Sequence, residues 1–313
     1  MNSKIKLSVI IISYNQEKYI SEAIESVINQ KTNFKYEILV SDDCSKDKTQ
    51  EIIEKYEKKY PNLVKNIKHK KNLGGTGNLL YITKFAKGEY VTILEGDDYW
   101  IDENKIQKQV DFLENNPKYI GISHLQKGIN LQNEFQGNFP KVIKEDCDIN
   151  MQDFLKGKTF SSSSCLYRNI YLEDEKYEKI KELFGLNRII GDVQLCTYLL
   201  SLGTIKVLAQ PMMVYRMRNK KGESNYNSIH NIAEINLEYL RIYKALEEIY
   251  DDYKYDFYNS IKECVVLGMS YSFCKLKLKK AIEIFKECPK KYRFKVILSF
   301  PITAINIIIK RYK

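Results

Sequence analysis

The first 120 residues of the chain alternate between the hydrophobic patterns of buried strands and of amphipathic helices. Continuous apolar runs rich in β-branched residues at 7–12, 36–40 and 90–94 predict strands that are buried on both faces. Strands that alternate with helices over short connections form a largely parallel sheet covered by helices. Ligands of such sheets bind beyond the carboxyl ends of the strands, so we expect the functional site there.

The segments between these runs carry apolar residues three or four positions apart, which predicts helices. We expect helices over 17–30, from about 47, up to about 87, and over 106–116. Asp47 followed by Gln50 has the spacing of a capping box, which predicts the start of the second helix.

We expect an α/β domain over 1–220 and a helical region over 221–313. Within 120–220 the pattern is weaker, with one helix centred on 193–202. A heptad-like apolar stripe over 232–249 has two interpretations. It either packs within its own domain or forms the seam of a homodimer.

The last segment, 290–313, is apolar at its centre and basic at both ends. It is too short to span a membrane comfortably. One interpretation is a buried C-terminal helix. The other is a segment lying in the headgroup region of an anionic membrane.

Composition excludes several classes of protein. The 313 residues are 44% hydrophobic and 29% charged, which excludes a chain that is disordered throughout. There are seven cysteines without a C-x-x-C pair and only three histidines, which argues against zinc and for free thiols in the cytoplasm. The net charge of +10 suits an anionic ligand or membrane surface, or reflects a lysine-rich composition alone. No motif points to nucleic acid.

Acidic residues follow the predicted strands. Asp42 and Asp43 come after the second strand, 95–98 (EGDD) after the third, and Asp192 precedes the helix at 193–202. Carboxylates gathered at one edge repel one another unless a cation compensates, and Asp97 with Asp98 is suited to Mg²⁺ or Mn²⁺. The alternative is helix capping by Asp98 or Asp102, and by Asp192.

The glycine-rich stretch NLGGTGN at 72–78 is neither a Walker A motif nor a G-x-G-x-x-G motif. Its backbone N–H groups are able to approach a diphosphate closely. A plain turn is the alternative.

Taken in order, LSVIIISYN, SDDCSKDKT, NLGG, KGEYVTILEGDDYW and GDVQL resemble the family 2 glycosyltransferases. The resemblance is dense over 5–115 and looser to about 218. It implies a GT-A fold with a nucleotide-binding half at 1–120 and an acceptor half at 121–220. It also implies inverting transfer of a sugar from a nucleotide-sugar, usually linked to UDP, to a saccharide or lipid-linked acceptor.

The resemblance also assigns roles to positions of this chain. Asp43 corresponds to the acid that binds uracil, and Tyr14 flanks the base unless it is a core tyrosine. Asp97 corresponds to the metal-binding end of a D-x-D motif, in which Glu95 replaces the commoner Asp. The positions implied to bind the nucleotide-sugar are Ser13, Tyr14, Asn15, Asp43, Asn72, Gly74, Glu95, Gly96 and Asp97.

Asp192 matches the general base of the family, although Gly191 stands where an acid is usual. The motif 215–218 (YRMR) matches a late motif in which His is frequent. We therefore expect Arg216 or Arg218 to face the diphosphate. The polar segment 219–227 is a candidate lid.

The resemblance implies a role in surface-polysaccharide synthesis. From the free thiols and the segment 290–313 we expect the protein in the cytoplasm or on the inner face of the cell membrane. Two alternatives stay open. One is a nucleotidyltransferase that makes sugar nucleotides, which the sequence SYNQEKY after the first strand disfavours. The other is a non-catalytic module that binds nucleotide-sugars.

Overall fold

The computed structural model describes residues 4–186, 191–217, 232–250, 255–274 and 277–300. The chain divides into two compact units, which are treated separately below. The first comprises 1–151 and 158–217, and the second comprises 152–157 and 218–313.

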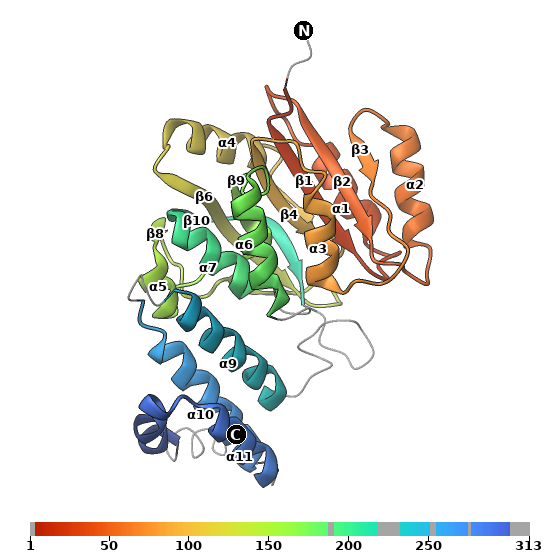
Figure 1. Cartoon of the computed structure of the whole chain (residues 1–313). Helices are drawn as coiled ribbons and strands as arrows, with labels where there is room; N and C mark the ends of the chain where they lie inside the picture. Colours follow the sequence, from red (N-terminus) through yellow and green to blue (C-terminus); the bar gives the residue numbers. More distant parts are fainter. Residues whose placement is uncertain (1–3, 187–190, 218–231, 251–254, 275–276, 301–313) are drawn as a thin grey trace. The chain divides into compact units, whose positions relative to one another are not determined.

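The first unit is an α/β unit built on one ten-stranded sheet (Figure 1). The strand order is β3-β2-β1-β4-β9-β6-β10-β5, with β7 paired to β6 and β8 to β10. The strands are β1 Leu7–Ser13, β2 Tyr36–Asp42, β3 Val64–Asn66, β4 Tyr90–Glu95, β5 Tyr99–Trp100, β6 Tyr119–Ile129, β7 Phe135–Phe139, β8 Cys147–Ile149, β9 Leu166–Arg168 and β10 Thr204–Arg216.

The helices of this unit alternate with the strands over the first 115 residues, as the hydrophobic pattern predicts. They are α1 Ile20–Ile28, α2 Thr49–Lys59, α3 Gly75–Thr83, α4 Lys105–Asn115, α6 Asp174–Gly185 and α7 Asp192–Leu202, with the short 3₁₀ helix η1 Ser162–Ser164. The helix α5, Met151–Leu155, crosses the boundary between the units.

The expected parallel arrangement holds for β3, β2, β1 and β4, which pair in parallel throughout. Beyond β4 the sheet is mixed, because β9 runs antiparallel to both β4 and β6. Three of these parallel strands, β1, β2 and β4, carry the apolar runs from which the sequence predicts strands covered on both faces.

Helices cover both faces of the sheet. Alternate residues of β1 (Leu7, Val9 and Ile11) share a core cluster with the apolar faces of α1, α2 and α4. On the other face α3 contacts α6, and α6 contacts α7, as Figure 1 shows in front of the sheet. This packing fixes the sheet, and with it the ends of its strands.

Two local predictions were wrong. No capping box opens α2, because Lys48 is its N-cap and the Asp47 carboxylate accepts from the Thr49 and Glu17 N–H groups instead. The glycine-rich stretch 72–78 is a loop only in part, since α3 already begins at Gly75.

The second unit is helical. Its helices are α9 Ile232–Ile249, α10 Tyr258–Cys274 and α11 Leu278–Glu287, followed by the 3₁₀ turn η3 Lys290–Tyr292 and helical residues 293–300. The stripe on α9 is buried within the chain at Ile242 and Leu246, and α9 packs on α10 and α11. This agrees with the stripe packing in its own domain, and the homodimer stays a prediction.

Across the described ranges, none of the helices combines the length and the apolar character needed to cross a membrane. Of the predicted membrane segment 290–313, residues 301–313 lie outside the described part of the chain.

Lys105, at the start of α4, is the most unusual core residue of the first unit. It is fully buried, its Nζ lies 4.1 Å from the centre of the Trp100 ring, and it donates to Gln109 Oε1 at 2.8 Å. Burial lowers the pKa of Lys105 to about 7. The unfolded chain therefore binds a proton that the folded chain releases above about pH 7.

We predict that replacing Lys105 with Met removes a pH dependence of stability. Between pH 7 and 10 the unfolded wild type holds the extra proton, so its free energy of unfolding rises with pH, on the order of 1.4 kcal/mol per pH unit. Lys105→Met lacks that rise, although the lost bond to Gln109 adds a cost that does not vary with pH. Urea unfolding at pH 7, 8 and 9 measures both slopes, and equal slopes would contradict the prediction.

Candidate active site at the carboxyl edge of the parallel strands

The site begins where three parallel strands end side by side. In the register of the ladder, Ser13 at the end of β1 is paired with Asp42 of β2, and Ile12 is paired with Glu95 of β4. The Asp43 N–H donates to the Ser13 carbonyl at 2.9 Å, which extends the ladder beyond β2. The loops after β2 and β4 therefore leave the sheet on either side of the end of β1.

Asp43 holds the glycine-rich loop against this edge. Its carboxylate accepts from the backbone N–H of Leu73 at 2.7 Å and of Gly74 at 2.9 Å. The Asn72 amide donates to the Asp43 carbonyl at 2.8 Å. Gly74 has φ +76°, which a residue with a side chain rarely adopts. The acid after β2 and the glycine-rich stretch, which the sequence predicts as separate features, are thus joined in one hydrogen-bonded structure.

His69 lies behind the Asp43 carboxylate, with its Nε2 3.5 Å from Oδ1 and its side chain almost wholly buried. Its Nδ1 lies 2.8 Å from the Lys71 carbonyl. Burial raises the pKa of Asp43, while the bonds from Leu73 and Gly74 and the nearby His69 oppose that rise. The backbone donors thus offset part of the cost of burying the charged carboxylate.

Asn15 joins the loop after β1 to the loop after β2. Its N–H donates to Ser45 Oγ at 2.7 Å, and its Oδ1 accepts from the Lys46 N–H at 2.9 Å. Asp42 accepts from the Ser45 N–H at 2.8 Å. Asn15 and Asp42 therefore shape the edge, while Tyr14 beside them is half-buried.

Gly96 allows the loop after β4 to touch the loop after β1. A Cβ at Gly96 would lie 2.4 Å from Gln16 Oε1 and 2.9 Å from the Ser13 Cβ. At this approach Gln16 Nε2 donates to Asp97 Oδ1 at 3.1 Å. The glycine between the two acids is thus required by packing, and it brings Asp97 to the end of β1.

Asp98 points into the protein. It is 1% exposed, and its Oδ1 accepts from the Arg216 N–H at 2.9 Å. Burial raises the pKa of Asp98 well above its ordinary value, and the charges of Asp97 and Glu95 raise it further. Asp98 does not cap α4, whose N-cap is Asn104.

Arg216, at the end of β10, supports the acidic loop 95–98 through its side chain. Its guanidinium donates to the Asp97 carbonyl and forms an ion pair with Glu22. The same group lies 4.9 Å from the centre of the Tyr19 ring and 4.7 Å from that of Tyr99. Arg216 is therefore engaged within the chain, beside the loop that carries Asp97.

Asp192 is the first residue of α7, and the N-cap is Gly191, so the alternative interpretation, in which Asp192 caps this helix, was wrong. Ser162 Oγ donates to Asp192 Oδ1 at 3.0 Å. The side chain reaches solvent. Neighbouring protein atoms displace water from the carboxylate, and this desolvation raises the pKa of Asp192. The hydrogen bond from Ser162 opposes the rise.

Two contacts connect Asp192 to the edge. The helix η1, which carries Ser162, packs on β4 and on α7. A Cβ at Gly191 would lie 3.2 Å from Thr76 Oγ1 in the first turn of α3. The start of α7 thus lies next to the first turn of α3, and η1 connects it to the strand that ends in Glu95.

Several buried polar atoms at this edge lack a hydrogen-bond partner among the residues that the structure describes. They are Ser13 Oγ, Gln16 Oε1, Thr76 Oγ1 and Asp98 Oδ2. An unpaired buried polar atom costs about 1–3 kcal/mol, so folded proteins keep few of them without a reason. A polar ligand or ordered water bound at this edge would give these atoms partners.

In the described part of the chain, no three His, Cys, Asp or Glu side chains gather as metal ligands would. The acidic loop instead offers Glu95 and Asp97 at the edge of the sheet, with Asp98 behind them. Mg²⁺ is usually held by one or two carboxylates together with phosphate oxygens. This oxygen-only set therefore fits a divalent cation that is shared with a phosphate ligand.

The structure thus places nearly all predicted residues around one edge. Arg218 and the lid 219–227 lie outside the described residues. Three residues of this edge were not predicted from the sequence, namely Gln16, His69 and Ser162. The nearness of Gln16 to the SYN motif and the run of four serines at 161–164 were the available signals. His69 follows β3, a strand too short to show a pattern.

Comparisons with known proteins give the same picture. A family model described as Glycosyl transferase family 2 matches residues 8–174. The poly(ribitol-phosphate) beta-N-acetylglucosaminyltransferase TarS of Staphylococcus aureus is 31% identical over 193 residues, 59% of this chain and 33% of that protein. The GalNAc(5)-diNAcBac-PP-undecaprenol beta-1,3-glucosyltransferase of Campylobacter jejuni is 29% identical over 181 residues, 58% of this chain and 56% of that protein. The chain spans about half the length, or less, of these curated relatives.

The fold is shared with a solved structure. The crystal structure of Staphylococcus aureus TarS 1–349 in complex with UDP-GlcNAc matches with a TM-score of 0.56 and 22% identity. The match covers 95% of this chain and 92% of that one. The expected GT-A fold with a helical C-terminal region is confirmed.

We predict that Arg216→Met destabilises the first unit by about 2 kcal/mol, because it removes a charge-assisted hydrogen bond and two cation–π contacts. Glu22→Gln removes only the half-exposed partner and is expected to cost less. Urea unfolding monitored by tyrosine and tryptophan fluorescence measures both. A Met variant as stable as the wild type would show that Arg216 does not support the loop.

Proposed function

The chain belongs to glycosyl transferase family 2, and from that premise we propose that it transfers a sugar from a UDP-sugar to an acceptor hydroxyl with inversion. The family match includes β1, β2 and β4, and so most of the edge described above. Membership in this family removes the nucleotidyltransferase alternative.

One observation carries the proposal: the acid that anchors the glycine-rich loop and the acidic loop flank the end of a single strand. Asp43 follows β2 on one side of β1, and Asp97 follows β4 on the other side. Both lie near Ser13 at the end of β1. Between them lie the unpaired buried oxygens of Ser13 and Gln16. UDP has a uracil base with an N–H donor at one end, which suits the Asp43 carboxylate, and an anionic diphosphate at the other, which suits a cation at the acidic loop. Crystal structures of TarS with UDP-GlcNAc and with UDP support a UDP-linked donor.

In the proposed reaction Asp192 is the general base. Its hydrogen bond from Ser162 and its exposure to solvent suit a carboxylate that takes the proton of an acceptor hydroxyl. As that proton passes to Asp192, the hydroxyl oxygen bonds to the anomeric carbon. The bond from that carbon to the diphosphate oxygen breaks, and the electron pair leaves with UDP. Attack from the face opposite the diphosphate inverts the anomeric configuration.

We further propose that Mn²⁺ or Mg²⁺ accompanies the donor, with Asp97 as a ligand. Asp98, the second ligand predicted from the sequence, points into the protein instead and accepts from the Arg216 N–H. When bound, such an ion neutralises the charge that grows on the departing diphosphate. Arg216 keeps Asp97 in place through its carbonyl, and Gln16 orients its carboxylate. The predicted contact of Arg216 or Arg218 with the diphosphate remains part of this proposal.

For the acceptor we propose a saccharide or a lipid-linked saccharide of a surface polysaccharide, with a hexosyl or N-acetylhexosaminyl group transferred. The names of the two relatives reported above, one acting on poly(ribitol-phosphate) and one on an undecaprenol-linked saccharide, support this class.

We predict that Asp192→Asn retains donor binding and loses transfer. The amide cannot accept the proton, so turnover should fall by about 10²–10⁴-fold while the affinity for UDP-GlcNAc stays within about twofold. Titration calorimetry and UDP release from a panel of UDP-sugars measure the two properties. Wild-type turnover would remove Asp192 as the base, and donor binding without any transfer by the wild type would favour a non-catalytic module.

Ser162→Ala provides a finer test of the same base. The lost hydrogen bond should raise the pKa of Asp192, so the acidic limb of the kcat profile moves to higher pH while donor affinity is unchanged. Ser161→Ala is the matched control, because Ser161 bonds Gln126 and Ser163 instead. An unshifted profile for Ser162→Ala would contradict this role.

We predict that Asp97→Ala abolishes the gain in UDP affinity on adding Mn²⁺. Without this carboxylate the cation loses its protein ligand at the edge of the sheet. Titrations of UDP with and without Mn²⁺ measure the gain, and Asp111→Ala on the surface of α4 is the matched control. A gain equal to that of the wild type would argue against the metal site.

A further inference from the structure

Most of the net charge of the protein lies in one short segment of the second unit. Residues 277–300 contain eight Lys or Arg and two Glu, whereas the whole chain carries a net charge of +10. Both acids are already paired, Glu283 with Lys280 at 3.0 Å and Glu287 with Lys244 at 2.8 Å. The basic excess is therefore a local surface feature rather than an even enrichment in lysine.

The same segment exposes large apolar side chains. Leu278 and Ile282, one turn apart on α11, are 55% and 54% exposed. Over 293–300, Phe294 is 73% exposed and Leu298 61%. The opposite faces are already buried, at Ile284 and Val296 for example, so the unit does not use these exposed residues for its own core.

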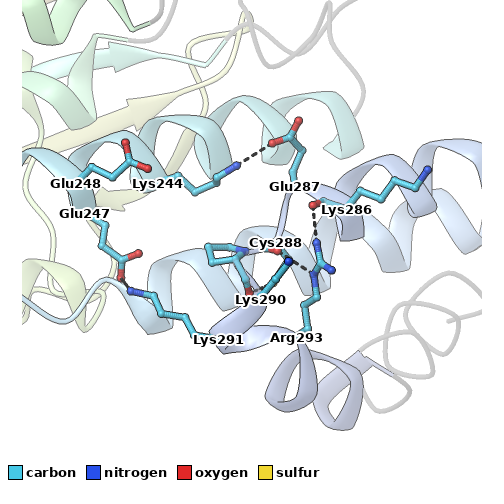
Figure 2. A pocket seen from close by; sticks show the side chains of 10 residues that line it. Lys244, Glu247, Glu248, Lys286, Glu287, Cys288, Lys290, Lys291 and Arg293 are labelled. Carbon is cyan, nitrogen blue, oxygen red and sulfur yellow. Dashed lines mark hydrogen bonds and ion pairs between the residues drawn. The ribbon is translucent and has the colours of Figure 1, made fainter.

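A pocket of about 610 Å³ opens within this unit among residues of α9, of α11 and of the turn after it (Figure 2). Two ion pairs lie along it, Lys244 with Glu287 and Lys291 with Glu247 at 3.2 Å. Figure 2 shows the Lys286 side chain running away from both pairs. Among the residues that the structure describes, no carboxylate pairs with Lys286 or Lys290. These two ammonium groups are therefore available to an external anion.

We propose that residues 277–300 form a surface that binds an anionic lipid bilayer, with Phe294 and Leu298 entering the headgroup region and Lys286 and Lys290 contacting lipid phosphates. Apolar side chains flanked by cations are what an anionic leaflet attracts. A second copy of this chain would present the same positive charge and be repelled. A soluble polyanion would use the cations but leave the apolar side chains exposed to water.

This proposal goes beyond sugar transfer and is tested without it. Purified full-length protein is floated with vesicles of phosphatidylcholine alone or of an equal mixture with phosphatidylglycerol. We expect binding to the mixed vesicles only, weakened at least about tenfold by Phe294→Ser with Leu298→Ser, and similarly by Lys286→Glu with Lys290→Glu.

Matched controls separate this surface from general effects. Phe135→Ser changes an aromatic residue that is 59% exposed in the first unit, and Lys55→Glu with Lys58→Glu makes the same charge change on α2. Both should bind as the wild type does. Circular dichroism and UDP titration of each variant test whether it is folded.

Three results would overturn the proposal. One is a wild type that does not bind the mixed vesicles, and another is unchanged binding by the apolar double variant. The third is a concentration-dependent dimer in sedimentation velocity that the Phe294→Ser and Leu298→Ser changes abolish, which would mean that a second copy covers the surface. If the protein binds inorganic polyphosphate tightly but does not bind vesicles, and only the lysine variant loses that binding, the ligand is a soluble polyanion. This outcome counts as the first result.

Discussion

The parallel pairing of β1 with both β2 and β4 is the constraint on which the site depends. Backbone hydrogen bonds place Ser13, Asp42 and Glu95 at the same height in the sheet. The loops that follow these residues therefore start at the same edge. Apolar side chains on both faces of these strands hold the register, because a slip by one residue would turn every side chain to the opposite face. A core made of aliphatic residues therefore determines where the carboxylates of the site lie.

The edge holds more charge and more unpaired polar atoms than stability alone would favour. Asp98 is buried, one of its oxygens has no hydrogen-bond partner in the described part of the chain, and its pKa is raised. Arg216 compensates in part, since it is fixed between two tyrosine rings and donates to the backbone of the acidic loop. Such a balance suits a site whose ligand brings both positive charge and hydrogen-bonding groups, as a cation–diphosphate pair does.

The sequence predicted the parallel strands and the acids at their ends because both follow from local rules. A continuous apolar run predicts a buried strand, and parallel strands end at a common edge. The supporting residues were not predictable in this way. Gln16 contacts Asp97 over 81 positions and Ser162 contacts Asp192 over 30, so only the fold brings them together. The strands β6, β9 and β10 were missed for another reason, because β6 and β10 interrupt their apolar residues with polar ones and β9 has only three residues.

The most direct test of the account is to locate the divalent cation relative to the three loops. Mn²⁺ broadens the NMR signals of nearby amides, so it can be titrated into amide-labelled protein saturated with UDP. The account predicts that signals of residues next to Ser13, Asp43, Gly96 and Asp192 broaden together at the same low Mn²⁺ concentration. Broadening around only one of these loops, or at a surface away from all of them, would contradict a common site at the carboxyl edge of the sheet.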